Sequence, residues 1–310
     1  MINNKRGFEF SFAWIFAIIV GAVIIFLAVW GVVQLIGTER TARDSEIGKE
    51  LGILLNPIET SLESGKSALI KMPGETRLFN DCNNNGVFGV QKISAATKSG
   101  IGDEWERPGI PSSFFNKYVF SADVVQGEDY KVFVKPFEFP YKVGDLIFIW
   151  SVDDEYCFVN APNNVEEDVE DLDLGISLVS SLGECSVQSK RVCFASSGCD
   201  VDVSLNSKSV YDGETKYYEG DLIYGAIFSG KERYECQVKR LMGRASELAL
   251  LNLAKTNYLT PKGCSSNMEN DLSGFANVTL NIGSSLDLRT LGFDSDDLGR
   301  RNNLLGCKLW

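Results

Sequence analysis

The strongest hydrophobic pattern in this chain lies at its N-terminus. Between Phe10 and Thr38 there is no ionisable side chain, and the 25 residues of 12–36 contain one clearly polar residue, Gln34. With a rise of about 1.5 Å per residue, a helix of this length spans a hydrocarbon core of roughly 30 Å. A buried core helix would show polar residues along one face. The pattern therefore predicts a transmembrane helix over 10–37, with the lipid bilayer as its partner.

The length of this run also separates an anchor from a cleaved secretion signal. The apolar region of a signal peptide usually has about 7–15 residues and ends at a small-residue cleavage site. The run here is longer, and the segment "LIGTERTARDS" that follows it contains no A-x-A site. We therefore expect the helix to remain in the protein.

Apolar residues at helical spacing continue beyond the predicted anchor. They are Ile47, Leu51, Leu54, Leu55, Ile58 and Leu62. Pro57 cannot donate to the preceding turn, whereas Asn56 and Glu59 beside it match a new helix start. The pattern predicts a juxtamembrane helical stalk over 38–72 that breaks near Asn56 and restarts. It leaves open whether the stalk stands free or folds back onto the next domain.

Residues 73–218 show the patterns of strands. Alternating or short apolar runs occur in "DYKVFVKPFEF", "DLIFIWS", "EYCFVN" and "KRVCFA". Asp212-Gly213 separates two strand-like arms and indicates a hairpin, because glycine tolerates a positive φ. The acidic segment 163–174 places Val165, Val169 and Leu172 on one helical face, so a solvated acidic helix is favoured there over a calcium site. We expect a β-rich ectodomain.

The segment 219–310 is predicted to be mainly helical. Ser229 to Glu232 fits a capping box, and apolar residues then follow at heptad-like spacing, with Glu235 and Lys239 placed to pair on the exposed face. From Cys264 to Cys307 the chain is rich in Asn, Gly and Ser, which indicates loops and one or two short helices. The expected fold class is α+β: a transmembrane helix, a β-rich ectodomain braced by disulfides and a helical C-terminal part.

Charge gives the expected orientation. Residues 1–9 contain Lys5 and Arg6, and short basic tails stay in the cytoplasm. Only these two basic residues and Glu9 precede residue 38, so 38–310 carries 28 basic and 41 acidic side chains. We expect a cytoplasmic tail or leader over 1–9 and an extracytoplasmic C-terminal domain. An acidic domain without a basic stripe excludes nucleic acid as a partner.

All eight cysteines follow the predicted span, which suggests disulfides in an exported domain. They are Cys82, Cys157, Cys185, Cys193, Cys199, Cys236, Cys264 and Cys307. Eight cysteines allow 105 pairings, so the sequence does not give the connectivity. Reduced structural cysteines are an alternative. A metal site is disfavoured because the chain has no C-x-x-C pair and no histidine.

The candidate chemistry is sparse. Without histidine, Ser-His-Asp and Cys-His catalysis cannot operate within this chain, and no H-E-x-x-H, G-x-S-x-G or P-loop motif occurs. We expect no cofactor and name no catalytic residue. Catalysis by carboxylates alone stays open, but the 42 acids give no preferred pair.

Two local motifs are candidate sites. Asp81, Asn83 and Asn85 match the first half of a calcium loop, but Lys92 stands where the bidentate glutamate should be, which favours a turn held by Cys82. The segment 294–299, "DSDDLG", is a weaker match. Asn277 begins the sequon Asn-Val-Thr, a glycosylation site in a host that glycosylates exported domains.

The residues Lys5-Arg6-Gly7-Phe8 before the hydrophobic helix resemble the class III leader of type IV pilins and archaeal pilin-like proteins. The resemblance implies cleavage after Gly7, so that Phe8 becomes the N-terminus and the helix packs into a filament core. Bacterial pilins place a glutamate fifth after the cut, whereas Glu9 is second here. The phrase "GFEFSFAW" also resembles the start of uncharacterised archaeal single-pass membrane proteins, which implies no known activity.

Three hypotheses follow. The first is a single-pass membrane protein with a structural or binding role at the cell surface, whose partners are other membrane or surface proteins or further copies of itself. The second is a pilin-like assembly subunit, and the third is an exported enzyme. A continuous helix over 12–55 with a sheet packed on its outer half would favour the second, whereas a deep cleft would favour binding or catalysis.

Overall fold

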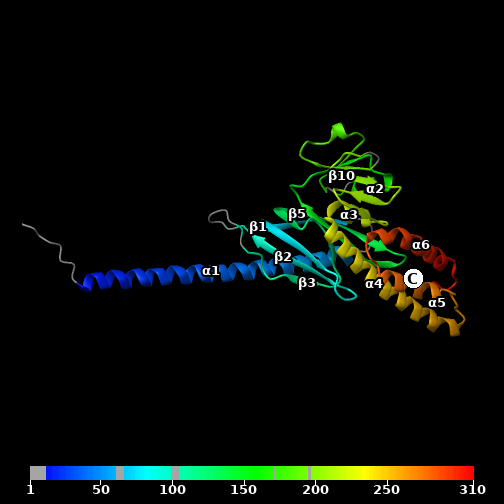
Figure 1. The fold of residues 1–310 in the computed structure, drawn as a ribbon, viewed down its shortest axis with the longest axis horizontal. Coiled ribbons are helices and arrows are strands. Elements are labelled where there is room, and N and C mark those ends of the chain that lie inside the picture. The colour runs from blue at the N-terminus through cyan, green and yellow to red at the C-terminus, as the bar shows by residue number, and fades with distance from the viewer. Residues whose placement is uncertain are drawn as a thin grey trace, which may run out of the picture.

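The computed structural model of this chain describes residues 12–60, 66–98, 105, 107–170, 172, 174–194 and 197–310. The fold is α+β, as the sequence predicts: an N-terminal apolar helix, a β-rich body and C-terminal helices. Figure 1 shows a long helical rod whose N-terminal half projects away from the body, with both sheets and the C-terminal helices gathered at its other end. The predicted tail or leader over 1–9, including Gly7 and Phe8, lies outside the described residues.

Helix α1 (Phe12–Thr60) is continuous over 49 residues. The predicted break near Asn56 is therefore wrong: Pro57 removes one backbone donor in the last turn, and the helix continues past it to Thr60. The predicted stalk also ends too late, because Lys66 already begins strand β1 (Lys66–Asn83). The outer part of α1 does not stand free: it continues the same helix and packs against the sheet that β1 joins.

The first sheet has six strands in the order β3-β2-β1-β5-β6-β4. Its pairs are antiparallel except β4 with β6, which is parallel. Besides β1, its strands are β2 (Val90–Thr97), β3 (Ser112–Phe114), β4 (Tyr118–Phe120), β5 (Val124–Glu138) and β6 (Lys142–Ser151).

Both faces of the first sheet are covered, which explains the unbroken apolar run in β6. Leu146, Phe148 and Trp150 belong to the large core shared with the C-terminal helices and the second sheet. Ile147 and Ile149 point to the opposite side, into a smaller core that includes residues of α1. Because successive side chains of a strand alternate between faces, a strand buried on both sides reads as continuously apolar.

The second sheet also has six strands, in the order β12-β11-β10-β9-β7-β8. They are β7 (Tyr156–Val159), β8 (Ile176–Val179), β9 (Lys190–Cys193), β10 (Val201–Ser204), β11 (Ser209–Tyr211) and β12 (Thr215–Tyr217). Gly213 lies between β11 and β12 with a φ of 101°, so the predicted hairpin is confirmed. The predicted acidic helix is α2 (Asn163–Val169), which buries Val165 and Val169, but it ends before Leu172, which was expected on the same helical face.

The C-terminal part is helical, as predicted. It consists of α3 (Leu222–Phe228), α4 (Lys231–Leu259), α5 (Glu269–Leu280) and α6 (Leu288–Leu304), with short 3-10 turns at Thr260–Lys262 and Ser285–Asp287 and a further one at Leu182–Glu184 between the strands. The segment expected to hold loops and short helices thus contains α6, a helix of 17 residues.

Two local predictions about α4 are wrong. The capping box at Ser229 is not formed: Gly230 precedes the helix, and the Ser229 hydroxyl donates instead to the Gly225 carbonyl at the end of α3. Glu235 accepts hydrogen bonds from the backbone and hydroxyl of Ser285, so it binds a neighbouring 3-10 turn in place of the expected Lys239. In both cases a tertiary contact takes the side chain that a local helix rule would use.

Candidate functional site: helix α1 and its junction with the body

The two halves of α1 have different surroundings. Phe12–Val32 is long and apolar enough to cross a membrane, and none of it is buried. Farther along, Asp44, Ile47 and Leu51 are only 1, 7 and 1 % exposed, because they pack against the first sheet. One continuous helix therefore carries a membrane-length apolar surface on its first half and part of a protein core on its second.

Small residues bring α1 unusually close to the sheet. A Cβ atom added to Gly48 would lie 3.2 Å from the carbonyl oxygen of Ile93, and one added to Gly52 would lie 2.1 Å from the ring of Phe114. From the other side, a Cβ on Gly109 would lie 2.6 Å from the backbone nitrogen of Ser45. Each glycine thus occupies a point where a larger side chain would push helix and sheet apart.

Polar contacts fix the position of the helix along the sheet. The Asp44 carboxylate accepts hydrogen bonds from the Thr97 hydroxyl at 2.9 Å and from its backbone nitrogen at 3.4 Å. The hydroxyl of Ser45 accepts a further bond from the backbone nitrogen of Ile110 at 2.9 Å. Because a buried carboxylate needs such donors, these bonds set one register between α1 and the sheet.

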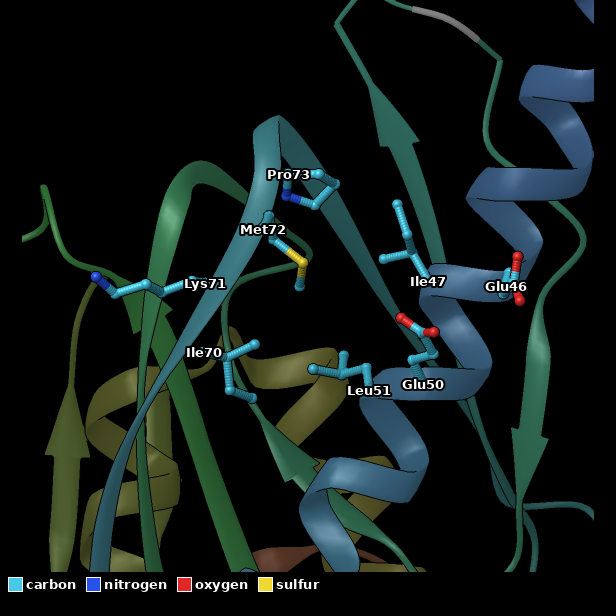
Figure 2. A pocket seen from close by; sticks show the side chains of 8 residues that line it. All are labelled: Glu46, Ile47, Glu50, Leu51, Ile70, Lys71, Met72 and Pro73. Carbon is cyan, nitrogen blue, oxygen red and sulfur yellow. The ribbon is translucent and has the colours of Figure 1, made fainter.

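A cavity of about 270 Å³ lies between α1 and β1 at this junction, and Figure 2 shows the side chains that line it. Ile47, Leu51, Ile70 and Met72 line it, and the amine of Lys71 points away from it. The cavity is smaller than most small-molecule sites, which measure about 300–1,000 Å³. It belongs to the interface between α1 and the first sheet.

All eight cysteines pair at bonding distance: Cys82 with Cys236, Cys157 with Cys185, Cys193 with Cys199 and Cys264 with Cys307. The sequence left this pairing open. The first bond joins β1 to α4 across 154 positions, and the last closes the segment that holds α5 and α6. The disulfides therefore brace the body between sheet and helices as well as within the C-terminal part.

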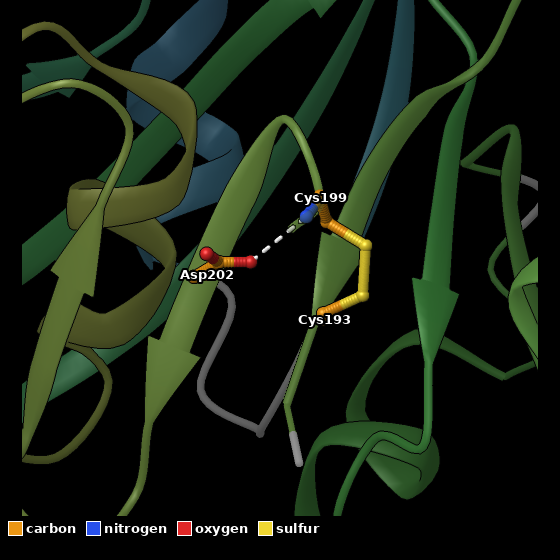
Figure 3. Close-up of side chains that lie close together, drawn as sticks. All are labelled: Cys193, Cys199 and Asp202. Carbon is orange, nitrogen blue, oxygen red and sulfur yellow. Dashed lines mark hydrogen bonds between the residues drawn. A yellow bond between two sulfur atoms is a disulfide. The ribbon is translucent and has the colours of Figure 1, made fainter. Parts of the chain in front are cut away.

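Cys193, Cys199 and Asp202 gather three atoms of metal-ligand type within 4.8 Å of one another (Figure 3). The two sulfurs are bonded to each other, and the Asp202 carboxylate accepts the backbone N–H groups of Gly198 and Cys199, each at 3.0 Å. Metal binding needs free thiolates, so this arrangement is that of a turn held by a disulfide.

The calcium candidates are held by protein donors. Asp81 forms an ion pair with Arg233 at 2.6 Å, and the Asn83 side chain accepts a bond from the backbone of Asn85 at 2.8 Å. Asp81 and Asn83 belong to the end of β1, on either side of Cys82 and its disulfide, and only Asn85 lies in the turn that leads to β2. The weaker match at 294–299 lies inside α6, and Asn277 lies on the exposed side of α5.

Sequence reasoning missed a buried polar network between α4 and the first sheet. The Arg240 guanidinium is 1 % exposed and donates to the carbonyls of Lys117 at 2.8 Å, Phe88 at 3.1 Å and Phe115 at 3.1 Å, and to Gln237 at 2.7 Å. Gln237 in turn donates to Gln91 on β2. The sequence did contain a signal for this network: Gln237 and Arg240 lie three positions apart in the predicted helix, beside its apolar residues Val238 and Leu241.

A second cluster joins the first sheet to α2 and α3. The Lys135 amine lies 2.5 Å from Asp168 and 3.7 Å from Asp221, and the Tyr224 hydroxyl donates to Asp168 at 2.8 Å. Burial raises the pKa of Asp221, despite the opposing effect of Lys135. The four groups come from three elements distant in sequence, so no local pattern could have shown the cluster.

Neither a protein-family model, nor a curated protein, nor a solved structure matches this chain. The resemblance to pilin leaders therefore rests on its N-terminal residues alone.

Proposed function

We propose that this chain is a single-pass membrane protein, held by α1, whose body lies on the extracytoplasmic side. An apolar N-terminal helix and disulfides are compatible with a membrane-anchored extracellular protein. The same helix would suit either an anchor or a signal peptide. The continuity of α1 supports the anchor, because cleavage behind Val32 would cut a helix that continues into the core of the body at Ile47 and Leu51.

Orientation is argued from charge and redox chemistry. Lys5 and Arg6 favour a cytoplasmic N-terminus. Disulfides persist in oxidising compartments outside the cytosol. Both considerations favour the same side of the membrane for the body.

The proposed role is structural or binding, at the cell surface. The chain is helical over the twelve residues that follow Val32 up to Asp44, so α1 holds the buried Asp44 about 18 Å beyond the described apolar segment. The buried contacts at Asp44, Gly48 and Gly52 join this helix firmly to the sheet. A body fixed on its anchor in this way suits the presentation of a surface or a binding site at a set distance from the bilayer.

The test is protease treatment of intact cells, followed by alkaline extraction of their membranes. The proposal predicts that added protease degrades the body without cell lysis, and that untreated protein stays in the membrane pellet at alkaline pH. Protection of the body in intact cells, or its release from the membrane by alkali, would contradict the proposal.

A pilin-like assembly subunit is the second candidate. One observation favours it: a single helix exposes an apolar first half and packs its second half on a sheet, the arrangement that was expected to favour such a subunit. This candidate predicts a mature chain that starts at Phe8, and filaments in preparations from the cell surface. A mature protein that retains residues 1–7 would contradict this candidate and favour an unprocessed membrane anchor.

A further inference from the structure

A second cavity lies far from the anchor, between the β10–β11 turn and the beginning of α6. Its volume is about 510 Å³, within the range typical of small-molecule sites. Figure 1 shows β10 and α6 on the side of the body remote from the projecting half of α1. A ligand in this cavity would therefore be held away from the membrane.

The cavity contains a buried carboxylate with spare hydrogen-bonding capacity. Glu219 is 9 % exposed, and its Oε2 atom binds the Lys208 amine at 2.6 Å. No described residue donates to its other oxygen, Oε1, and burial raises the pKa of this carboxyl. Gly292 on α6 makes room for that oxygen, since a Cβ there would lie 2.6 Å from Oε1. A ligand that donates a hydrogen bond would satisfy it.

Cationic donors face the same space. The Arg289 guanidinium lies 5.6 Å from the centre of the Tyr217 ring, and the described residues offer it no carboxylate partner. Lys208 adopts a φ of +48°, a conformation that non-glycine residues rarely take and that is enriched at binding sites. Lys208 and Arg289 are balanced in charge by Glu219 and Asp287, which also line the cavity. This lining favours a polar ligand without net charge.

One wall of the cavity is apolar and open to solvent. Phe293 is 77 % exposed and Leu286 is 48 % exposed, while the Thr290 hydroxyl lies on the same helix as Phe293. An aromatic ring beside alternating donors and acceptors suits a molecule with one C–H face and several hydroxyl groups. We propose that this cavity binds a neutral sugar unit, with a sugar hydroxyl donating to Glu219, another accepting from Arg289 and the ring face resting on Phe293.

The experiment is saturation-transfer NMR and titration of the full chain in phosphatidylcholine nanodiscs, because alkyl glycoside detergents carry the same chemistry as the probe. The probes are the methyl glycosides of glucose, galactose, mannose and N-acetylglucosamine, with glucuronate as the charged comparison. The proposal predicts saturable binding of at least one neutral glycoside, tighter than that of glucuronate. It also predicts that Phe293→Ala weakens this binding about threefold to tenfold, and that Arg289→Met weakens it as well.

Phe115→Ala is the matched control, since it removes a phenyl group that is 66 % exposed but lies outside the cavity. It should leave the affinity unchanged. Phe293 and Arg289 are both exposed, so their variants are expected to fold, and equal melting temperatures would verify this. Absence of binding to all four neutral glycosides, a preference for glucuronate, or equal affinity of Phe293→Ala and wild type would each overturn the proposal. None of these results tests the separate proposal that α1 anchors the protein in a membrane.

Discussion

At the scale of single residues, the junction between α1 and the body depends on glycines, which have no side chain to keep the helix and the sheet apart. Gly52 lies where any Cβ atom would come within 2.1 Å of the Phe114 ring. A sequence reader sees only a glycine that weakens a helix. Only the structure shows that Gly52 lets the Phe114 ring approach the helix backbone closely.

Gly52→Ala should therefore destabilise the protein by about 1–3 kcal/mol, because α1 or Phe114 must move. Gly274 is the matched control: it is exposed on α5 with nothing within 4 Å of an added Cβ. Gly274→Ala should be neutral or stabilising by up to about 1 kcal/mol, since alanine favours a helix. Urea unfolding of both variants checks this. Equal effects at the two positions would contradict the close packing of α1.

Arg240→Ala should cost about 3 kcal/mol, because it leaves the buried carbonyl of Lys117 and the partly buried carbonyls of Phe88 and Phe115 without their donor. Arg240→Lys should rescue little, since an ammonium group cannot reproduce the planar fork of five donors. The exposed Arg300 serves as control, and its alanine variant should change the unfolding free energy by less than about 1 kcal/mol. If urea unfolding showed only a small loss of stability for Arg240→Ala, the claim that this network stabilises the fold would be wrong.

At the scale of elements, the disulfides should contribute unequally. Cys82 and Cys236 are 154 positions apart, whereas Cys193 and Cys199 are 6 apart. By chain entropy, replacing the first pair with serine should destabilise the protein by about 3 kcal/mol more than replacing the second. Thermal unfolding of the two double variants measures the difference. A larger loss from the short bridge would show that unfolded-state entropy does not decide their contributions.

The N-terminal end of α3 should make stability depend on pH. Burial raises the pKa of Asp221 above its usual 3.8, with Lys135 opposing the shift and Asp168 and Glu138 adding to it. The folded state thus keeps a proton that the unfolded chain has already lost. The unfolding free energy should fall as pH rises from 3.8 through the raised pKa.

Asp221→Asn removes this ionisation, so the variant should gain stability relative to wild type as pH rises across that window. Melting temperatures of the two proteins at a series of pH values provide the measurement. Asp294→Asn, at an exposed position on α6, is the control and should parallel wild type. Parallel profiles for Asp221→Asn and wild type would show that the burial of Asp221 has no influence on folding.

Element by element, the sequence predicted what local patterns determine. The apolar N-terminal helix, the strands around Val132 and Ile147 and the hairpin at Gly213 follow from hydrophobic period and turn chemistry. The continuity of α1 through Pro57 was not predicted: the sequence pattern did not show that this proline falls in the last turn of a helix that already exists, where it removes only one backbone donor. The disulfide pairing depends on long-range geometry, and so do the contacts of Arg240 and Glu219.

At the scale of the whole molecule, α1 unites two environments. Its first half has the length and composition of a membrane span, and its second half closes the smaller core of the first sheet. The larger core joins the other face of that sheet to the second sheet and the C-terminal helices. A force or displacement applied to the body would thus reach the anchor through packed structure, without an intervening flexible linker between Phe12 and Thr60.

The most direct test of the central claim is the intact mass of the protein recovered from alkali-washed membranes, alkylated with and without prior reduction. The account predicts that the full α1 is retained, with no alkylation before reduction and eight sites after it. This result would place four disulfides in a protein that keeps its membrane helix. A mature chain that begins after α1's apolar segment, or eight reactive thiols before reduction, would contradict the anchored, extracytoplasmic account.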